Sequence, residues 1–569
     1  MLMKKLFLIL AAAAVTMWSC QKPAVTPTDE GGKQGGEEQN PDPKPEVKDE
    51  ITLISDAIVN LPTKDSQQFT VKFTTNAAWT AEADEFITLQ KTSGEAGENI
   101  EVMAVIQSVG DEEYGRVGGI LIKAGKAEAR VGIMQGKVFI VDPQESEIGI
   151  EGGKVEFQVI SNQEYTVKTY DAADAAFPWA PVTFDQETGM GSLAVEPNGG
   201  YDARYAYIKF TVPGIQVPAY DDEGNPTGEN EDYVTRFYVY QAGNSKTAWN
   251  IALPQGFDVT NVEADYTHYP TASIALFGDK VLVSDGTTLY AFDKASGAAS
   301  TITVPSGLPV QSITNDDAGN VLFANEGFTG SNVEIYAVRA DASDLSGFVK
   351  VAEAANGVWC AATADCVKAK GDVFGNAVIS VLIGGGTGFG NPSYAMVWQV
   401  TAGVADGSKY VAGPTDYSDT IWISNRGSFA PAGDTDAAGY FYCGYDGVYA
   451  LNYFNGTEWS HAVEGLGDWS MAPNAIASTV WNGKAIVAVN SMAYWGLDWS
   501  MPSILYVLDM TGGEILAQTE YVAAEESVVT GGQEASTTDV VLKVEGNDLA
   551  AYVVDSDWGL VTKIVYPKL

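Results

Sequence analysis

From residue 51 onwards, the chain consists largely of short segments in which apolar and polar residues alternate. Clear examples are Phe69–Phe73, Ile100–Val105 and Val131–Met134, and Gly, Asp and Asn separate such segments from one another. A period of two residues indicates β-strands with one buried face, and the separating residues are typical of turns. We therefore expect an all-β chain.

A repeated unit is present in residues 244–569. Each copy has a Gly, Asn or Asp turn, an apolar strand, a connection and a second apolar strand. The copies begin near Phe277, Ala318, Phe374, Ala438, Trp481 and Gly546. Six copies give a spacing of about 54 residues, which is typical of four-stranded propeller blades. The prediction is a six-bladed β-propeller, with a β-helix or two further β-sandwiches as the alternatives.

In residues 51–137, several characteristic residues occur in the same order as in the BACON domain, and the segment resembles this immunoglobulin-like module of Bacteroidetes surface proteins. Phe86 stands where many members of that family have a second Trp. The resemblance implies an immunoglobulin-like β-sandwich and a sugar-binding role. The matching marks are Trp79, Ser93-Gly94, Gly97, Arg116 and Gln135.

Residues 138–243 repeat the same scheme more loosely, and we expect a second BACON-like β-sandwich there. Tyr165 takes the place of Trp79, and Arg204 and Gln241 correspond to Arg116 and Gln135. A polar insertion at 216–232 is expected to form a loop between the last two strands, where a hairpin tolerates extra length. Trp79 lies in a strand pattern, and we expect it in the core and not on a surface where it could bind a sugar. We therefore interpret both modules as spacers.

The first fifty residues indicate export and anchoring. Lys4 and Lys5 precede an apolar run, Leu6–Val15, that is too short to span a bilayer, as in a secretory signal. With Cys20 at the first mature position, residues 1–19 resemble a bacterial lipoprotein signal peptide, although Met17-Trp18 departs from the usual lipobox. Residues 20–50 are rich in Pro, Gly and charge and predict a lipid-anchored disordered linker.

These features predict a lipoprotein anchored through Cys20 in the outer membrane and exposed at the cell surface. The alternatives are an ordinary signal peptide that happens to contain a cysteine, and an anchor in the leaflet that faces the periplasm. Acyl chains on Cys20 would hold the protein stably, because two or more chains anchor where one does not.

The charge of the chain restricts its partners. It has 74 acidic and 32 basic residues and a formal net charge of -42. Nucleic acid is excluded because its binding depends on Lys and Arg that neutralise phosphates, and polyanionic sugars are disfavoured for the same reason. Cys360, Cys366 and Cys443 show no zinc spacing and are expected to be buried free thiols, with a Cys360–Cys366 bridge as the alternative.

Candidate ligand-binding residues lie in the connections between the two strands of each repeat. Most of these connections hold an aromatic residue beside Gly, Asn, Asp or Ser, which suits a sugar ring: its C–H face packs on the aromatic and its hydroxyls bind the polar neighbours. The alternative is that these aromatics pin long loops or fill space between blades. The predicted residues are Trp495, Trp499, Tyr494, Phe389, Tyr394, Trp558, Tyr445, Phe328 and Trp469.

No catalytic motif is found. The two histidines, His268 and His461, have no His or Cys nearby, and the chain has no Gly-x-Ser-x-Gly elbow. The aspartates Asp434 with Asp436, and Asp555 with Asp557, are expected in solvated turns rather than in calcium sites.

We therefore expect no cofactor, no metal and no catalysis. The predicted function is capture of a neutral glycan, in company with an outer-membrane uptake complex. An adhesin or scaffold that binds a protein partner is the first alternative, since Trp and Tyr are also common protein hot spots. A propeller glycoside hydrolase or lyase is the second, because some pair of carboxylates always lies at a suitable separation.

Overall fold

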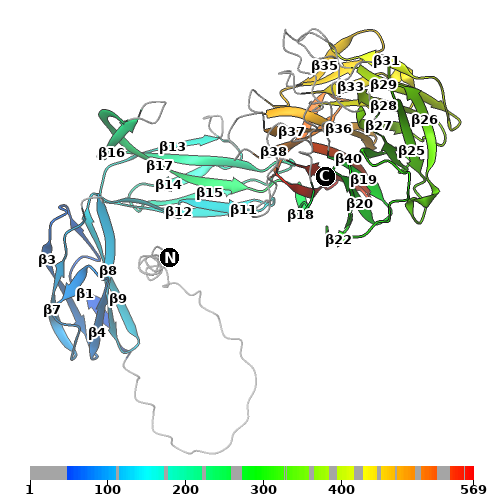
Figure 1. The fold of residues 1–569 in the computed structure, drawn as a ribbon. Coiled ribbons are helices and arrows are strands. Elements are labelled where there is room, and N and C mark those ends of the chain that lie inside the picture. Colours follow the sequence, from blue (N-terminus) through cyan, green and yellow to red (C-terminus); the bar gives the residue numbers. More distant parts are fainter. Residues whose placement is uncertain are drawn as a thin grey trace, which may run out of the picture. The chain divides into compact units, whose positions relative to one another are not determined.

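The protein is described by a computed structural model, shown in Figure 1. The described residues are 48–110, 114–171, 177–220, 226–257, 272–325, 327, 330–357, 364–383, 394–414, 427–444, 450–467, 471–493, 502–521, 538–556 and 558–569. They contain strands and two single-turn 3-10 helices, so the prediction of an all-β chain is confirmed. None of the helices in these ranges has the length and apolar character needed to cross a bilayer.

The chain divides into two compact units. Unit 1 contains the described residues up to Pro197 together with Tyr205–Gln241, and unit 2 contains Asn198–Arg204 and Ala242–Leu569. Unit 1 is built from two sandwich-like modules, each with two sheets around its own apolar core. Cys20 and the other residues before Lys48 lie outside the described residues.

The first module has sheets of order β1-β3-β7-β5 and β2-β9-β8-β4-β6. Its strands are β1 (Ile51–Leu53), β2 (Ile58–Leu61), β3 (Gln67–Thr75), β4 (Trp79–Ala83), β5 (Ile87–Leu89), β6 (Ser93–Gly94), β7 (Gly97–Ile106), β8 (Gly115–Ala124) and β9 (Ala127–Gly136). Alternate residues of these strands fill the space between the sheets, as the period of two predicts.

Several of the residues that carry the resemblance to the BACON domain make packing contacts in this module. Trp79 is 2% exposed and packs edge-on against Phe73 with ring centroids 5.1 Å apart, so its predicted core position is confirmed. A Cβ on Gly94 would lie 2.7 Å from Trp79 Nε1, which leaves no room for a side chain there. Arg116 lies 4.1 Å from the ring centre of Phe86, and its Nε donates a hydrogen bond of 3.1 Å to Gln135 Oε1.

The second module has sheets of order β10-β12-β15-β14 and β11-β17-β16-β13 (Figure 1). Its strands are β10 (Phe139–Asp142), β11 (Glu145–Ile148), β12 (Gly153–Ser161), β13 (Thr166–Asp171), β14 (Val182–Asp185), β15 (Met190–Val195), β16 (Arg204–Tyr220) and β17 (Pro226–Gln241). Phe157, Phe210 and Phe237 are fully buried in its core, and Tyr165 packs against them from a half-buried position.

The predicted loop at 216–232 is wrong. β16 continues to Tyr220 and β17 begins at Pro226, so most of the insertion extends the hairpin. Its polar composition led to the loop prediction, yet a two-stranded ladder pairs its backbone groups whether or not either face is covered. Length and polarity alone therefore did not separate a loop from a solvated hairpin.

The described residues of unit 2 form six antiparallel sheets, numbered here from one to six, of which five have four strands and the third has five. Sheets one to three contain β19 (Ser273–Phe277), β20 (Lys280–Ser284), β21 (Leu289–Asp293), β22 (Ala299–Ser300); β23 (Ser312–Asn315), β24 (Val321–Ala324), β25 (Asn332–Val338), β26 (Val349–Ala355); and β27 (Ala364–Gly371), β28 (Ala377–Ile383), β29 (Tyr394–Thr401), β30 (Val404–Ala405), with β31 (Lys409–Ala412) also on β29.

Sheets four to six follow the same plan. They contain β32 (Ser428–Pro431), β33 (Tyr440–Cys443), β34 (Ala450–Phe454), β35 (Trp459–Glu464); β36 (Met471–Trp481), β37 (Lys484–Ala493), β38 (Ser503–Asp509), β39 (Glu514–Tyr521); and β40 (Thr538–Glu545), β41 (Asp548–Asp555), β42 (Leu560–Tyr566) with β18 (Lys246–Ala252). The two strands predicted in each sequence repeat are the second and third strands of these sheets.

The six sheets pack against one another in cyclic order. Each first strand contacts the next, along β19, β23, β27, β32, β36 and β40, and β40 contacts β19. Six buried apolar clusters each combine residues of two neighbouring sheets, and one of them joins sheet six to sheet one through Val541, Tyr552 and Ile274. Most of the apolar burial in unit 2 is therefore between sheets.

Short polar side chains also link neighbouring first strands. In three cases a side chain near the start of one first strand accepts a backbone N–H from the next: Ser273 from Ile313 (3.0 Å), Ser312 from Val367 (3.0 Å) and Asp539 from Ile274 (3.1 Å). The last of these bonds joins sheet six to sheet one. These hydrogen bonds pair backbone N–H groups of the first strands, for which the apolar side chains nearby offer no acceptor.

Two cysteines, Cys366 and Cys443, lie among the described residues. Cys443 is buried, as predicted, and Cys366 is half-buried in a bulge of β27 with a φ of 53°. Cys360, the other member of the alternative bridge, lies outside the described residues.

Strand β18 completes sheet six, although it precedes every other strand of unit 2 in the chain. Its Trp249 is 8% exposed, donates from Nε1 to the Lys294 carbonyl (3.2 Å) and lies against Gly297, where a Cβ would approach the indole to 2.9 Å. The side chain thus ties the completed sheet six to sheet one.

We predict that Trp249→Ala destabilises unit 2 by about 3–5 kcal/mol, because it removes a large buried side chain and its hydrogen bond from this junction. Guanidinium unfolding followed by tryptophan fluorescence measures the change. Val480→Ala, at a position 64% exposed in the same unit, is the control and should alter stability by less than about 0.5 kcal/mol. Equal stability of Trp249→Ala and the control would contradict the role assigned to β18.

Candidate ligand edge and central cavity

The connections in unit 2 fall at two edges of its sheets. Because antiparallel strands alternate in direction, the connections between second and third strands share an edge with those from a fourth strand to the next first strand. We call this the loop edge. The turns between first and second strands, and between third and fourth strands, lie at the opposite edge, which we call the turn edge. The predicted ligand-binding residues all belong to connections of the loop edge.

Seven of the nine predicted residues lie outside the described residues: Trp495, Trp499, Tyr494, Phe389, Tyr445, Phe328 and Trp469. The other two, Tyr394 and Trp558, are among the described residues. Tyr394 is the first residue of β29 and is half-buried, and Trp558 follows β41. Trp558 is half-buried against the apolar cluster of sheets five and six, and its indole N–H has no acceptor among the described residues.

A buried polar network supports the loop edge between sheets five and six. The Tyr521 hydroxyl lies 2.9 Å from Asn490 Oδ1 and 3.0 Å from Asp555 Oδ2. Ser503 donates to Asp555 Oδ2 at 2.6 Å, and the backbone N–H of Trp558 donates to Asp555 Oδ1 at 3.1 Å. Burial, followed by the negative charge of Asp555, raises the pKa of Tyr521 well above its ordinary value, so the phenol stays protonated.

The expectation that Asp555 lies in a solvated turn is wrong, because its side chain is fully buried. Both of its oxygens accept hydrogen bonds from the start of β38 and from the turn that carries Trp558. Asp436 likewise has protein partners, since it pairs with Lys409 and accepts a hydrogen bond from Tyr440. Asp557 lies outside the described residues.

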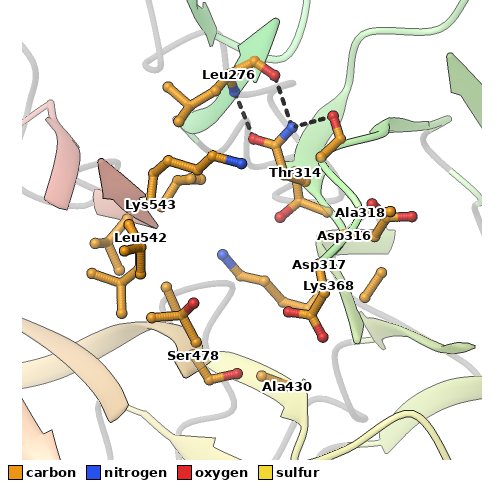
Figure 2. Close-up of a pocket in the computed structure, with 18 of the residues that line it drawn as sticks. Leu276, Thr314, Asp316, Asp317, Ala318, Lys368, Ala430, Ser478, Leu542 and Lys543 are labelled. Carbon is orange, nitrogen blue, oxygen red and sulfur yellow. Dashed lines mark hydrogen bonds between the residues drawn. The ribbon is translucent and has the colours of Figure 1, made fainter. Parts of the chain in front are cut away.

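Sequence reasoning missed a cavity of about 380 Å³ near the turn edge. The first strands of all six sheets, or the turns that follow them, contribute to its wall, and Figure 2 shows the lining side chains. Its ionisable lining residues are Lys294, Asp316, Asp317, Lys368 and Lys543. The available signal was the pair Lys368 and Lys370 in an otherwise apolar first strand, where a charged side chain needs a buried partner or a cavity.

Lys368 forms a buried ion pair with Asp539, with Nζ and Oδ1 2.5 Å apart and both side chains less than a tenth exposed. β27 and β40 are three steps apart in the cyclic order of first strands, so the pair joins opposite sheets. Burial by itself lowers the pKa of Lys368, but the Asp539 carboxylate outweighs it and the pKa lies above its ordinary value. Burial raises the pKa of Asp539, and Lys368 offsets this only in part.

Asp316 is a buried carboxyl of the cavity wall. It accepts hydrogen bonds from the backbone of Val373 (2.9 Å) and from the side chain of Asn320 (2.7 Å), while burial raises its pKa. These bonds connect the turn after β23 to the turn after β27. Asp316 therefore links sheet two to sheet three through hydrogen bonds.

No group of three or more His, Cys, Asp or Glu side chains in the described part of the chain could hold a metal ion. His461 lies on β35, and its Nδ1 is 2.9 Å from Asn452 Oδ1.

A family model described as Domain of unknown function (DUF8500) matches residues 256–555, more than half of the chain. The chain belongs to the DUF8500 family. The match ends with the last residue of β41, so β18 and β42, which together complete sheet six of this DUF8500 protein, lie outside it.

Comparison of the DUF8500 chain with curated proteins gives no match. Similar solved structures include a Bacteroides ovatus GH5 xyloglucanase in complex with a XXXG heptasaccharide, at 16% identity and a TM-score of 0.14, over 15% of this chain and 19% of that one. The N-terminal domain of Nup159 matches at 11% identity and a TM-score of 0.25, over 52% and 77%.

Human protocadherin-24 EC1-2 matches at 11% identity and a TM-score of 0.12, over 34% of this chain and 96% of that one. The DUF8500 chain spans about a fifth of the length of the xyloglucanase chain. At these TM-scores the likenesses carry no argument about function.

We predict that Lys368→Met destabilises the DUF8500 protein by about 3–5 kcal/mol at pH 7, because it leaves Asp539 buried without a counter-charge. Lys368→Met/Asp539→Asn, which removes the charge but keeps an acceptor for the Ile274 N–H, should recover most of the loss. The penalty of the single variant should shrink as the pH falls towards 4, since Asp539 has a raised pKa and can take up a proton in the folded state.

Urea unfolding of the wild type, the single variant and the double variant at pH 7 and at pH 4 measures these differences. A single variant as stable as the double variant at pH 7 would contradict the ion pair, as would a penalty that grows on acidification.

Proposed function

We propose that this protein is a cell-surface lipoprotein that captures a neutral glycan without acting on it chemically. Unit 2 is, in this proposal, a six-bladed β-propeller, and the two modules of unit 1 are immunoglobulin-like. The cyclic contacts of the first strands, the six clusters between neighbouring sheets and the completion of sheet six by β18 support the propeller. The two-sheet modules support the immunoglobulin-like description.

The observation that carries the functional proposal is the convergence of the aromatic-rich connections on one edge. The segment containing Tyr494, Trp495 and Trp499 leaves β37 after Ala493 and enters β38 at Ser503, both at the loop edge. The turn with Trp558 and the start of β29 at Tyr394 belong to the same edge. An edge of six sheets that collects aromatic residues suits an extended ligand better than a small one.

The chemistry of the ligand follows from the residue types at this edge. Aromatic rings accept the C–H faces of sugar rings, and the neighbouring Asn, Asp and Ser groups can bind hydroxyls. A net charge of -42 repels sulfated or uronic polymers, so a neutral glycan is favoured. We expect weak binding, with Kd between about millimolar and micromolar, or about 4 to 8 kcal/mol. Delivery to an outer-membrane uptake complex is part of the same proposal.

We predict that Trp495→Ala/Trp499→Ala weakens binding by roughly tenfold or more, because both rings serve as platforms. Affinity electrophoresis through gels that contain neutral polysaccharides measures the change. Tyr220→Ala, which removes an aromatic that is 61% exposed in unit 1, is the control. Retardation that survives the double substitution would remove these residues from the site, and a protein retarded by no glycan would favour the adhesin alternative.

The membrane anchor has its own test. Cys20→Ala should move the protein from the membrane fraction to the soluble fraction, because it removes the acylated residue. Fractionation with immunodetection measures the distribution, and protease treatment of intact cells determines whether the anchored protein faces outwards. Unchanged membrane partitioning of Cys20→Ala would refute the lipid anchor.

A further inference from the structure

The second module carries a continuous row of tyrosines on the face of the β11-β17-β16-β13 sheet that points away from its core. Tyr205 and Tyr207 alternate with the buried Ala206 and Ile208 on β16, and Tyr238 and Tyr240 alternate with buried residues on β17. Alternate residues of a strand share one face, so the four phenols lie on the same side. We call these four residues the tyrosine platform.

The four rings contact one another in sequence. Tyr238 and Tyr240 are stacked with centroids 5.8 Å apart and planes 15° apart. Tyr205 lies 6.2 Å from Tyr240, and Tyr207 lies 5.8 Å from Tyr238. Arg236 extends the row, with its guanidinium carbon 5.2 Å from the ring centre of Tyr207.

The platform is accessible. Tyr205 is 44% exposed and Tyr240 is 41% exposed, which is unusual for large rings in a regular sheet. Exposed contiguous aromatic surface in a soluble protein commonly marks an interaction site. Cross-strand aromatic pairs also stabilise sheets, so a stability readout has to accompany any functional test.

Charges of both signs flank the platform, which bears on the identity of the ligand. Glu145 and Glu147 of β11 are in register with Tyr238 and Tyr240 on one flank. Lys168 of β13 is in register with Lys209 of β16 on the other flank. An anionic polymer would meet the two glutamates, and a cationic one would meet the two lysines and Arg236, so a neutral ligand suits the whole surface.

We propose that the tyrosine platform binds an extended, neutral, β-linked polysaccharide. A row of four rings in mutual contact offers a continuous aromatic strip, and phenol hydroxyls and flanking charged groups offer hydrogen bonds along both sides. Equatorially linked β-glycans form ribbons whose faces carry C–H groups, whereas α-linked glucans coil away from a flat surface. The proposal extends glycan capture to unit 1 and does not depend on the loop edge of unit 2.

The test uses affinity electrophoresis of the full chain in gels that contain hydroxyethylcellulose, a soluble neutral β-1,4-glucan, or glycogen, an α-glucan. The background is Trp495→Ala/Trp499→Ala, so that the loop-edge aromatics contribute nothing. In this background, Tyr205→Ala/Tyr240→Ala should raise the Kd for hydroxyethylcellulose by roughly tenfold. Tyr205→Phe/Tyr240→Phe keeps the rings and should stay within about threefold.

Two controls separate binding from folding. Tyr220→Ala removes an exposed ring of β16 outside the platform and should leave the Kd unchanged. Thermal unfolding of each variant verifies that unit 1 remains folded at the temperature of the gel, and the Phe variant keeps the inference testable if the Ala variant unfolds.

The outcomes distinguish this inference from the proposed function. Retardation that persists in the Trp background and is lost with the platform supports the inference. A Trp variant that shows no retardation overturns it and leaves the loop-edge proposal standing. Equal retardation of the platform variant and its parent overturns it, and so does equal binding of glycogen. Self-association that disappears with Tyr205→Ala/Tyr240→Ala, without retardation in either gel, would assign the face to a second copy of the chain.

Discussion

The buried ion pair between Lys368 and Asp539 is the constraint on which the arrangement of unit 2 depends. It joins first strands that are three steps apart in a cycle of six, in the region where all six first strands approach one another. A lone charge in such a place would be very unfavourable, so each member requires the other. Asp539 also accepts the Ile274 N–H, which adds the junction between sheets six and one to the same carboxylate. We infer that the pair specifies how the sheets face one another more than it adds net stability.

Because the ion pair lies at the centre of unit 2, the residues that stabilise the fold differ from those proposed to bind the ligand. The apolar clusters between sheets and the polar links between first strands use residues of the strands and not of the connections at the loop edge. Connections at that edge can therefore vary in length and carry aromatic residues at little cost to the fold, as is usual for binding loops on a rigid scaffold. Asp555 marks the boundary between the two roles, because its carboxylate is buried in the scaffold and holds the turn of Trp558.

The strands were predictable because their signal is local. The repeated unit of apolar strands identified the second strands of all six sheets and the third strands of five, and a strand position correctly put Trp79 in the core. Three-dimensional pairing was not predictable in this way. Asp555 looked solvated because it follows a strand beside Asp557, and only the fold brings Ser503 and Tyr521 to it. The hairpin at 216–232 looked like a loop because its strands are polar.

The tyrosine platform went unnoticed because Tyr205 and Tyr240 come together only through the pairing of β16 with β17.

Hydrogen–deuterium exchange with and without a neutral β-linked oligosaccharide tests the central claim most directly, because it reports every segment of the chain at once. The account predicts slower exchange on ligand addition in peptides that span the connection from β37 to β38 and the turn from β41 to β42, with unchanged exchange around the cavity formed by Thr314, Lys368 and Ser478. Protection confined to the cavity residues, or no protection anywhere in unit 2 at saturating ligand, would contradict it.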